Sequence, residues 1–156
     1  MGDIVNKMRI VDGNGQRLYL NLLERKRFIE ASKDEVRENR MFCHVLHDTG
    51  CRLSEAIELT PDRIMMETSE IQFRSLKKRK YDMRGNLKLP EYRNVPVSNN
   101  LIELLDLTFN LKILRNNEKT IGKQLFTKSR NTYWRIVKNV MKSVGIKGKM
   151  AVPKGL

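Results

Sequence analysis

The feature that most constrains this fold is the stretch 47–59, where a glycine and an arginine separate two helical patterns. Gly50 follows a helical run and predicts a left-handed helix end. The apolar residues that the second helix would bury are Leu53, Ala56, Ile57 and Leu59. Arg52 is therefore expected in a turn that two packed helices hold in place. A planar guanidinium fixed in this way suits bidentate binding of a phosphate or a carboxylate.

Two interpretations of Arg52 follow from the residues alone. In the ordinary one, Arg52 forms a structural ion pair with Glu55 or Glu58 on the following helix. In the other, its guanidinium stays available and binds an anion. The residues themselves leave both interpretations open.

The charge of the chain indicates a polyanionic partner. Its 156 residues include 31 Lys and Arg against 18 Asp and Glu, a net charge of +13, and they suffice for one ordinary core. Nucleic acid is the expected partner, and an anionic membrane surface is the alternative. The sequence has no apolar run of the ~20 residues that span a bilayer and no apolar signal core. We therefore expect a cytoplasmic protein without a membrane partner.

Two helices are predicted before the arginine turn. Asn21 with Glu24 indicates a capping box that opens the first helix. Ser32 with Glu35 repeats that signature ahead of a second helix at roughly 34–49. The inward stripe of the second helix would contain Val36, Phe42, Cys43 and Leu46.

Three strand-like segments follow, at 63–67, 70–76 and 91–97, and predict a three-stranded antiparallel sheet. Alternation along the second strand places Lys77 on its apolar, inward face. Because an apolar residue also occupies the opposite face, Lys78 remains the alternative.

Two further helices are expected in the C-terminal half, starting after Ser98 and Ser129. The apolar residues at helical spacing are Leu101, Leu104, Leu105 and Leu111 in the first and Trp134, Val137, Met141 and Val144 in the second. A basic tail follows Gly145. The predicted class is α+β, mostly helical with a small three-stranded antiparallel sheet, with an arm or linker at 1–16 and one domain at 17–156.

A zinc site is not expected, although the spacing of the possible ligands would suit one. Cys43, His47 and Cys51 lie four residues apart, and His44 is adjacent to the first of them. Gly50 is predicted to end the helix before Cys51, however, and Cys43 belongs to an apolar stripe. With two cysteines in all, a disulfide framework is not expected either.

Three motifs resemble those of the tyrosine recombinase, or phage integrase, family. Residues 49–55 read Thr-Gly-Cys-Arg-Leu-Ser-Glu and are similar to the family's first arginine motif. Leu76-Lys77 with the later run at 92–97 resembles its lysine-bearing hairpin. Pro153-Lys154-Gly155-Leu156 resembles the start of its next motif. The resemblance implies a mostly helical catalytic domain, of which 17–156 would be the N-terminal two-thirds.

The resemblance also implies site-specific DNA strand exchange through a phosphotyrosyl intermediate. No metal or other cofactor would take part, and the intact protein would act as an oligomer on double-stranded DNA. Arg52 would clamp a phosphate oxygen, Lys77 would protonate the 5′-hydroxyl leaving group, and Lys154 would assist proton movement or charge neutralisation. Glu55 would orient Arg52. Further DNA contacts are predicted at Lys78, Arg79, Lys80, Arg93 and Arg130.

The family's second arginine and its nucleophilic tyrosine have no match in this sequence. The tyrosines present, none in the family's position, are Tyr19, Tyr81, Tyr92 and Tyr133. We therefore expect a fragment of a longer integrase, from a mobile element and nucleoid-associated if bacterial, that binds DNA but does not cut it alone. The alternative function is a non-catalytic double-stranded DNA-binding module. A basic RNA-binding protein is a more distant one, because aromatic residues for base stacking are sparse.

Overall fold

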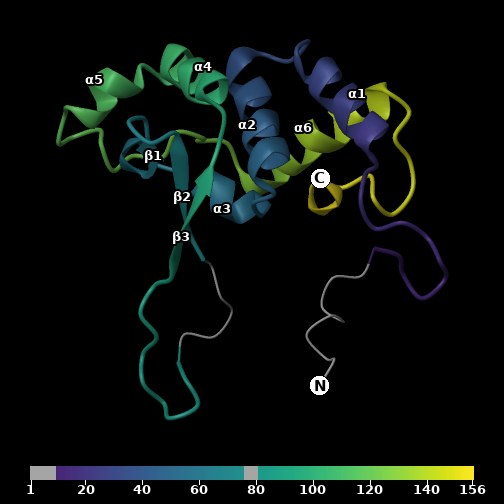
Figure 1. Ribbon diagram of the computed structural model, residues 1–156, viewed down its shortest axis with the longest axis horizontal. Coiled ribbons are helices and arrows are strands. Elements are labelled where there is room, and N and C mark those ends of the chain that lie inside the picture. Colours follow the sequence, from purple (N-terminus) through teal and green to yellow (C-terminus); the bar gives the residue numbers. More distant parts are fainter. Residues whose placement is uncertain (1–9, 76–80) are drawn as a thin grey trace.

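A computed structural model describes residues 10–75 and 81–156 of the chain (Figure 1). The helices are α1 (Leu22–Ser32), α2 (Arg37–Thr49), α3 (Leu53–Ile57), α4 (Asn99–Phe109), α5 (Leu111–Arg115) and α6 (Arg130–Ser143). The strands are β1 (Ile64–Met65), β2 (Glu70–Arg74) and β3 (Tyr92–Pro96), and two 3-10 turns are η2 (Pro61–Arg63) and η3 (Pro153–Gly155). The predicted class, mostly helical with one small antiparallel sheet, is confirmed.

The sheet has the order β1-β2-β3, and both pairs of neighbours run antiparallel. Ile71 and Phe73 are fully buried while the residues between them are half-buried, so alternation along β2 holds as predicted. The register places Arg93 opposite Phe73 and Arg74 opposite Tyr92. From the far end of the sheet, segment 81–91 extends away from the helices (Figure 1).

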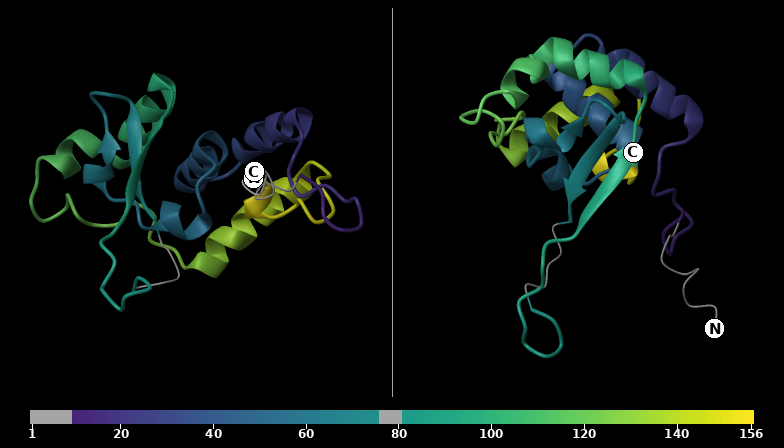
Figure 2. Two further views of the ribbon diagram at one scale, coloured as in Figure 1. Left: turned by 60° about the horizontal axis from the view of Figure 1, so that its bottom comes forward. Right: turned by 60° about the vertical axis from the view of Figure 1, so that its left-hand side comes forward.

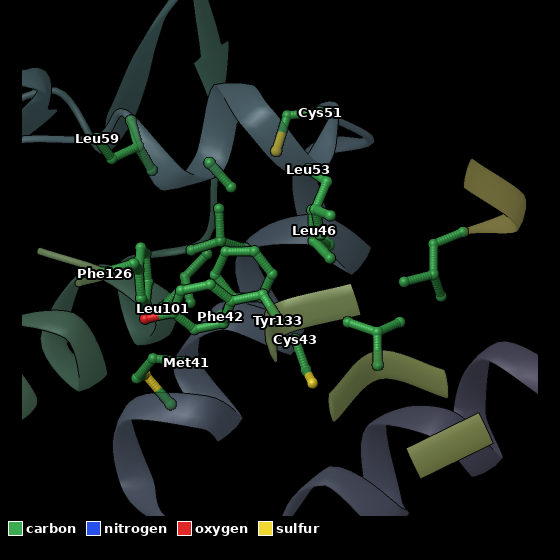
Figure 3. Packing of buried hydrophobic residues seen from close by; sticks show 14 of the residues in the cluster. Met41, Phe42, Cys43, Leu46, Cys51, Leu53, Leu59, Leu101, Phe126 and Tyr133 are labelled. Carbon is green, nitrogen blue, oxygen red and sulfur yellow. The ribbon is translucent and has the colours of Figure 1, made fainter. Parts of the chain in front are cut away.

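An aromatic cluster forms the centre of the core. The Phe42 ring stacks on the Tyr133 ring with centroids 4.1 Å apart and meets the Phe126 ring edge-on at 5.0 Å. Figure 3 shows these rings among the side chains of α2, α3 and α6. Helix α6 packs against α1, α2 and α3, so the short helix α3 rests on the main body of the domain.

The first predicted capping box is confirmed and the second is wrong. The Asn21 side chain accepts the Glu24 N–H at 2.8 Å, and the Glu24 carboxylate accepts the Asn21 N–H at 3.0 Å. Ser32 instead completes α1, where its hydroxyl donates to the carbonyl of Ile29. Helix α2 consequently begins later than predicted, and Val36 lies at its start with 64% of its surface exposed.

The helix predicted after Ser98 is divided in two. Asn110 adopts a left-handed conformation (φ 56°, ψ 51°) and ends α4, so Leu111 belongs to the separate helix α5. Asn is one of the few residues that tolerate this conformation, and its N–H is bonded to the carbonyl of Asp106.

One other expectation for the C-terminal half is wrong. Trp134 is 38% exposed, and its neighbour Tyr133 is fully buried in its place. The inward stripe of α6 contains Tyr133, Val137, Val140 and Met141. The basic segment after Gly145 packs on the domain, because Ile146, Met150, Ala151 and Leu156 are buried in the core.

The left-hand view in Figure 2 shows the sheet at one end of the molecule and α1 with the C-terminal segment at the other. Backbone bonds tie that far end together, since Leu20 N–H donates to the carbonyl of Gly155 at 2.8 Å. Within the described residues, none of the helices is both long and apolar enough to cross a bilayer.

Candidate nucleic-acid interface

The turn that carries Arg52 is built as the sequence predicts. Gly50 has a φ of 65° and ends α2 with its N–H bonded to the carbonyl of Leu46. Arg52 follows as the extended N-cap residue of α3 (φ −76°, ψ 153°). Its neighbours Cys51 and Leu53 are buried, whereas Arg52 itself is exposed. The backbone is thus anchored on both sides while the side chain faces solvent.

Glu55 fixes the backbone of this turn. Its side chain is 4% exposed, and Oε1 accepts the backbone N–H of Arg52 at 2.8 Å. Both carboxylate oxygens also bind Arg93, with Oε2 at 2.5 Å from Nη1 and Oε1 at 3.0 Å from Nη2. Burial raises the pKa of Glu55, but the hydrogen bonds from Arg93 and the Arg52 backbone outweigh it and leave that pKa below the ordinary value of 4.5. Glu55 is therefore a fixed anion.

Glu58, the other candidate partner of Arg52, is also engaged elsewhere. Its Oε1 accepts a hydrogen bond from Nη2 of Arg74 at 2.8 Å. Among residues 10–75 and 81–156, the Arg52 guanidinium has neither a hydrogen bond nor an ion pair. Of the two interpretations that the sequence left open, the ion pair with Glu55 or Glu58 is therefore not formed, and the guanidinium is available to an anion.

Arg130 lies beside the same helix. Its Nε donates to the hydroxyl of Ser54 at 3.1 Å, which brings the first residue of α6 next to the start of α3. Helix α6 carries no Asp or Glu and four basic residues, Arg130, Arg135, Lys138 and Lys142. The charged side chains of α6 are thus all cationic, and Arg130 is the one that the hydrogen bond to Ser54 places at the start of α3.

For the other predicted site residues, the part of the chain that the structure describes shows no contact with the turn that carries Arg52, or gives them another partner. Lys154 is an exposed residue of η3, and η3 packs on α6 as α3 does. Lys77, Lys78, Arg79 and Lys80 lie outside the described residues. Arg93, which we expected to contact DNA, has both terminal nitrogens bound to Glu55 and only 44% of its side chain exposed. That geometry favours an indirect role for Arg93.

Several side chains that could act as nucleophiles or metal ligands instead have a structural role. Tyr133 donates to Glu38 at 3.0 Å, and burial is the main cause that raises its pKa to about 12. Burial likewise raises the pKa of each thiol, Cys43 and Cys51, to about 12. His47 pairs with Asp48 at 2.7 Å, pointing to local use of that ring rather than a shared site with the cysteines.

Sequence reasoning missed Arg74 and the use of Glu58. The signal was partly present, because Arg74 ends a strand whose polar face includes no other cation. Its pairing with an acid at the far end of α3 depends on how the sheet meets that helix, which no local pattern encodes.

Comparison with known proteins decides the architecture. The fold matches that of the XerA recombinase with a TM-score of 0.64, over 88% of this chain and 46% of that chain, at 23% identity. The chain has the tyrosine recombinase fold. Two structures of the XerH site-specific recombinase bound to difH substrates match with TM-scores of 0.65 and 0.64 at 17% identity.

This chain spans less than half the length of those recombinases, 44–46%, although the matches cover 88–97% of the chain itself. No protein-family model and no curated protein sequence matches it. The tyrosine recombinase fold expected from motifs around Arg52 is thus supported by the backbone as a whole, at identities that establish fold alone.

Proposed function

We propose that this chain is part of a tyrosine recombinase catalytic domain, spanning 17–156, and that it binds double-stranded DNA through phosphate groups. The observation that carries the proposal is the state of Arg52. Its backbone is fixed by Glu55, its guanidinium is exposed, and both neighbouring carboxylates are bound to other arginines. A guanidinium that is carried on an anchored backbone and has no carboxylate bound to it is suited to a phosphate.

The proposed chemistry, in the intact parent protein, is site-specific recombination. A tyrosine oxygen attacks phosphorus while its hydroxyl proton is released to solvent, the bond to the 5′-oxygen breaks, and the leaving oxygen takes a proton from Lys77. Arg52 neutralises charge that develops on a non-bridging oxygen, and Lys154 assists with charge or proton movement. Arg130 and the basic run Lys78-Arg79-Lys80 contact the flanking phosphates. The parent acts as an oligomer on DNA, in the cytoplasm or nucleoid.

The 156-residue chain by itself binds DNA without cutting it. Tyr133 is buried, donates a hydrogen bond to Glu38, and has a raised pKa, so it is not an activated nucleophile. Tyr92 lies under the Arg63 guanidinium at 5.8 Å on the sheet, and Tyr81 pairs with Leu87 in the extended segment. Neither has a general base among its described partners.

A nicked suicide substrate that traps phosphotyrosyl adducts tests the chemical half of this proposal. The expected result is duplex binding in a gel shift and no covalent band on a denaturing gel. A covalent band that disappears on changing Tyr81, Tyr92 or Tyr133 to Phe would contradict it. The same gel shift separates the alternatives, since preference for single-stranded RNA over duplex DNA would favour the RNA-binding reading.

The alternative function, a non-catalytic DNA-binding module, predicts the same DNA binding by this chain. The two functions differ in whether the parent protein cleaves a DNA strand. In a parent that does, Arg52→Lys is expected to abolish most strand cleavage, because a point charge cannot make the bidentate contact. A parent protein that binds DNA but never forms a covalent adduct on the nicked substrate would favour the module.

A further inference from the structure

The charges around α3 do not cancel. Arg52, Arg74 and Arg93 contribute three positive charges, and Glu55 and Glu58 contribute two negative ones. The two carboxylates are bound by the two sheet arginines, Glu55 by Arg93 and Glu58 by Arg74. Among these five side chains the charge left over is that of Arg52, whose guanidinium makes neither a hydrogen bond nor an ion pair in the part of the chain that the structure describes. Arg130, which donates to Ser54, adds a further cation beside them.

We infer that Arg93 is a positioning residue, which occupies the carboxylate of Glu55 and thereby keeps the Arg52 guanidinium free for phosphate. The inference rests on the proposed function and adds a positioning residue to the proposed phosphate site. Arg93 acts through Glu55 and does not itself bind the phosphate. Without Arg93, Glu55 becomes the ion-pair partner of Arg52, and the anion site closes.

The position of Glu55 makes this competition direct. Glu55 is three residues beyond Arg52, the spacing at which side chains of one helical turn meet, and Oε1 already touches the Arg52 backbone N–H at 2.8 Å. A carboxylate that is 4% exposed is costly to leave unpaired, so loss of Arg93 would draw the nearest cation to it. That nearest cation belongs to Arg52.

The Arg93 guanidinium is held in place for this task. It lies over the ring of the fully buried Phe73, with 5.2 Å between the guanidinium carbon and the ring centroid, and directly across the β2–β3 pair from that residue. Its two contacts with Glu55 have the parallel geometry of a bidentate pair.

Arg74 provides a matched control on the neighbouring strand. It also bridges the sheet to α3, and its side chain is 38% exposed against 44% for Arg93. Its partner Glu58 lies at the C-cap of α3, the opposite end from Arg52. Removing Arg74 therefore deletes the same formal charge and a similar bridge, but releases no carboxylate beside the Arg52 backbone.

The experiment measures the affinity of the purified chain for a duplex DNA at fixed salt, in Arg93→Gln, Arg74→Gln and Arg52→Ala. Arg93→Gln is expected to lose ~10-fold or more, close to the loss in Arg52→Ala, because both remove the same charge-assisted contact. Arg74→Gln is expected to lose less than ~3-fold. Equal losses in Arg93→Gln and Arg74→Gln would overturn the inference.

A second set of variants distinguishes release of Glu55 from direct contact between Arg93 and DNA. Adding Glu55→Gln to Arg93→Gln removes the competing charge while its amide oxygen can still accept the Arg52 N–H, so affinity should return to within ~3-fold of the unmodified chain. Adding Glu67→Gln instead restores the same net charge on an exposed residue and should not rescue binding. A double variant that stays as weak as Arg93→Gln would show that Arg93 touches the phosphate itself.

Unfolding by urea in each variant checks that the fold persists. Should Arg93→Gln fail to fold, Arg93→Lys takes its place, because a lysine retains one point contact to Glu55. The DNA affinity of Arg93→Lys should then lie between those of the unmodified chain and Arg52→Ala. An affinity equal to that of the unmodified chain would contradict the inference. If the unmodified chain does not bind duplex DNA, the proposed function fails. If it binds and only the pattern among variants is absent, the role of Arg93 fails alone.

Discussion

Ser54 on α3 accepts a hydrogen bond from Nε of Arg130 on α6, at 3.1 Å and across 76 residues of sequence. Within residues 10–75 and 81–156 the terminal nitrogens of Arg130 make no hydrogen bond or ion pair, so they are available to an anion next to the start of α3. Arg130→Gln is expected to weaken duplex binding by ~10-fold, since a hydrogen bond to a charged group contributes about 1.5 to 3 kcal/mol. Ser54→Ala, which keeps the cation, should lose less than ~3-fold in the same gel-shift titration. A Ser54→Ala loss as large as that of Arg130→Gln would contradict this division of roles.

The Glu55 pair predicts a pH dependence of stability. Because the pKa of Glu55 is lower in the folded chain than its ordinary value of 4.5, its contribution is present above that value and is lost as pH falls through the folded pKa. The difference in unfolding free energy between the unmodified chain and Glu55→Gln should therefore be largest near neutral pH and shrink as the pH falls below the ordinary pKa of 4.5. Urea unfolding at several pH values measures it. A difference that does not change with pH would contradict the assignment, and the exposed Glu67→Gln serves as control.

The close packing around Gly155 can be tested by adding a side chain there. A Cβ at this position would lie 2.0 Å from the carbonyl oxygen of Met150, whereas a Cβ at Gly122 would meet nothing within 4 Å. Gly155→Ala should destabilise the fold by about 1 to 3 kcal/mol, as overpacked sites do, and Gly122→Ala should change it by less than about 0.5 kcal/mol. Thermal or urea unfolding of the two variants decides this, and equal stabilities would show that the turn is not packed as described.

The two thiols should be inert in the native chain. Cys43 and Cys51 are buried, and burial raises the pKa of each to about 12, so very little thiolate exists at neutral pH. A chromogenic disulfide reagent is expected to label neither residue in buffer and both in denaturant. Rapid labelling of Cys51 in buffer would mean that the turn carrying Arg52 opens, and rapid labelling of Cys43 would mean that α2 separates from the core.

Local patterns predicted the parts of this fold that depend on neighbours in sequence. The capping box at Asn21, the helix end at Gly50 and the buried alternation of Ile71 and Phe73 each need only a few adjacent residues. Ser32 failed because a serine bonds to a carbonyl within its own helix as readily as it caps the next one.

The remaining errors arose where tertiary contacts choose between similar residues. Trp134 and Tyr133 are adjacent aromatics, and only packing against Phe42 selects Tyr133 for the core. At the site, the motif located Arg52 but could not reveal that Glu55 pairs with Arg93, because that pair joins α3 to β3 across 38 positions of sequence.

The most direct test of the account is the salt dependence of duplex binding with and without Arg52. For the unmodified chain, log affinity should fall linearly with log salt, with a slope of about −0.9 for each phosphate contacted. Arg52→Ala should reduce the magnitude of that slope by about 0.9, one phosphate contact, while Lys119→Ala, in an exposed loop, should leave it unchanged. An Arg52→Ala slope identical to that of the unmodified chain would show that this guanidinium does not contact DNA phosphate.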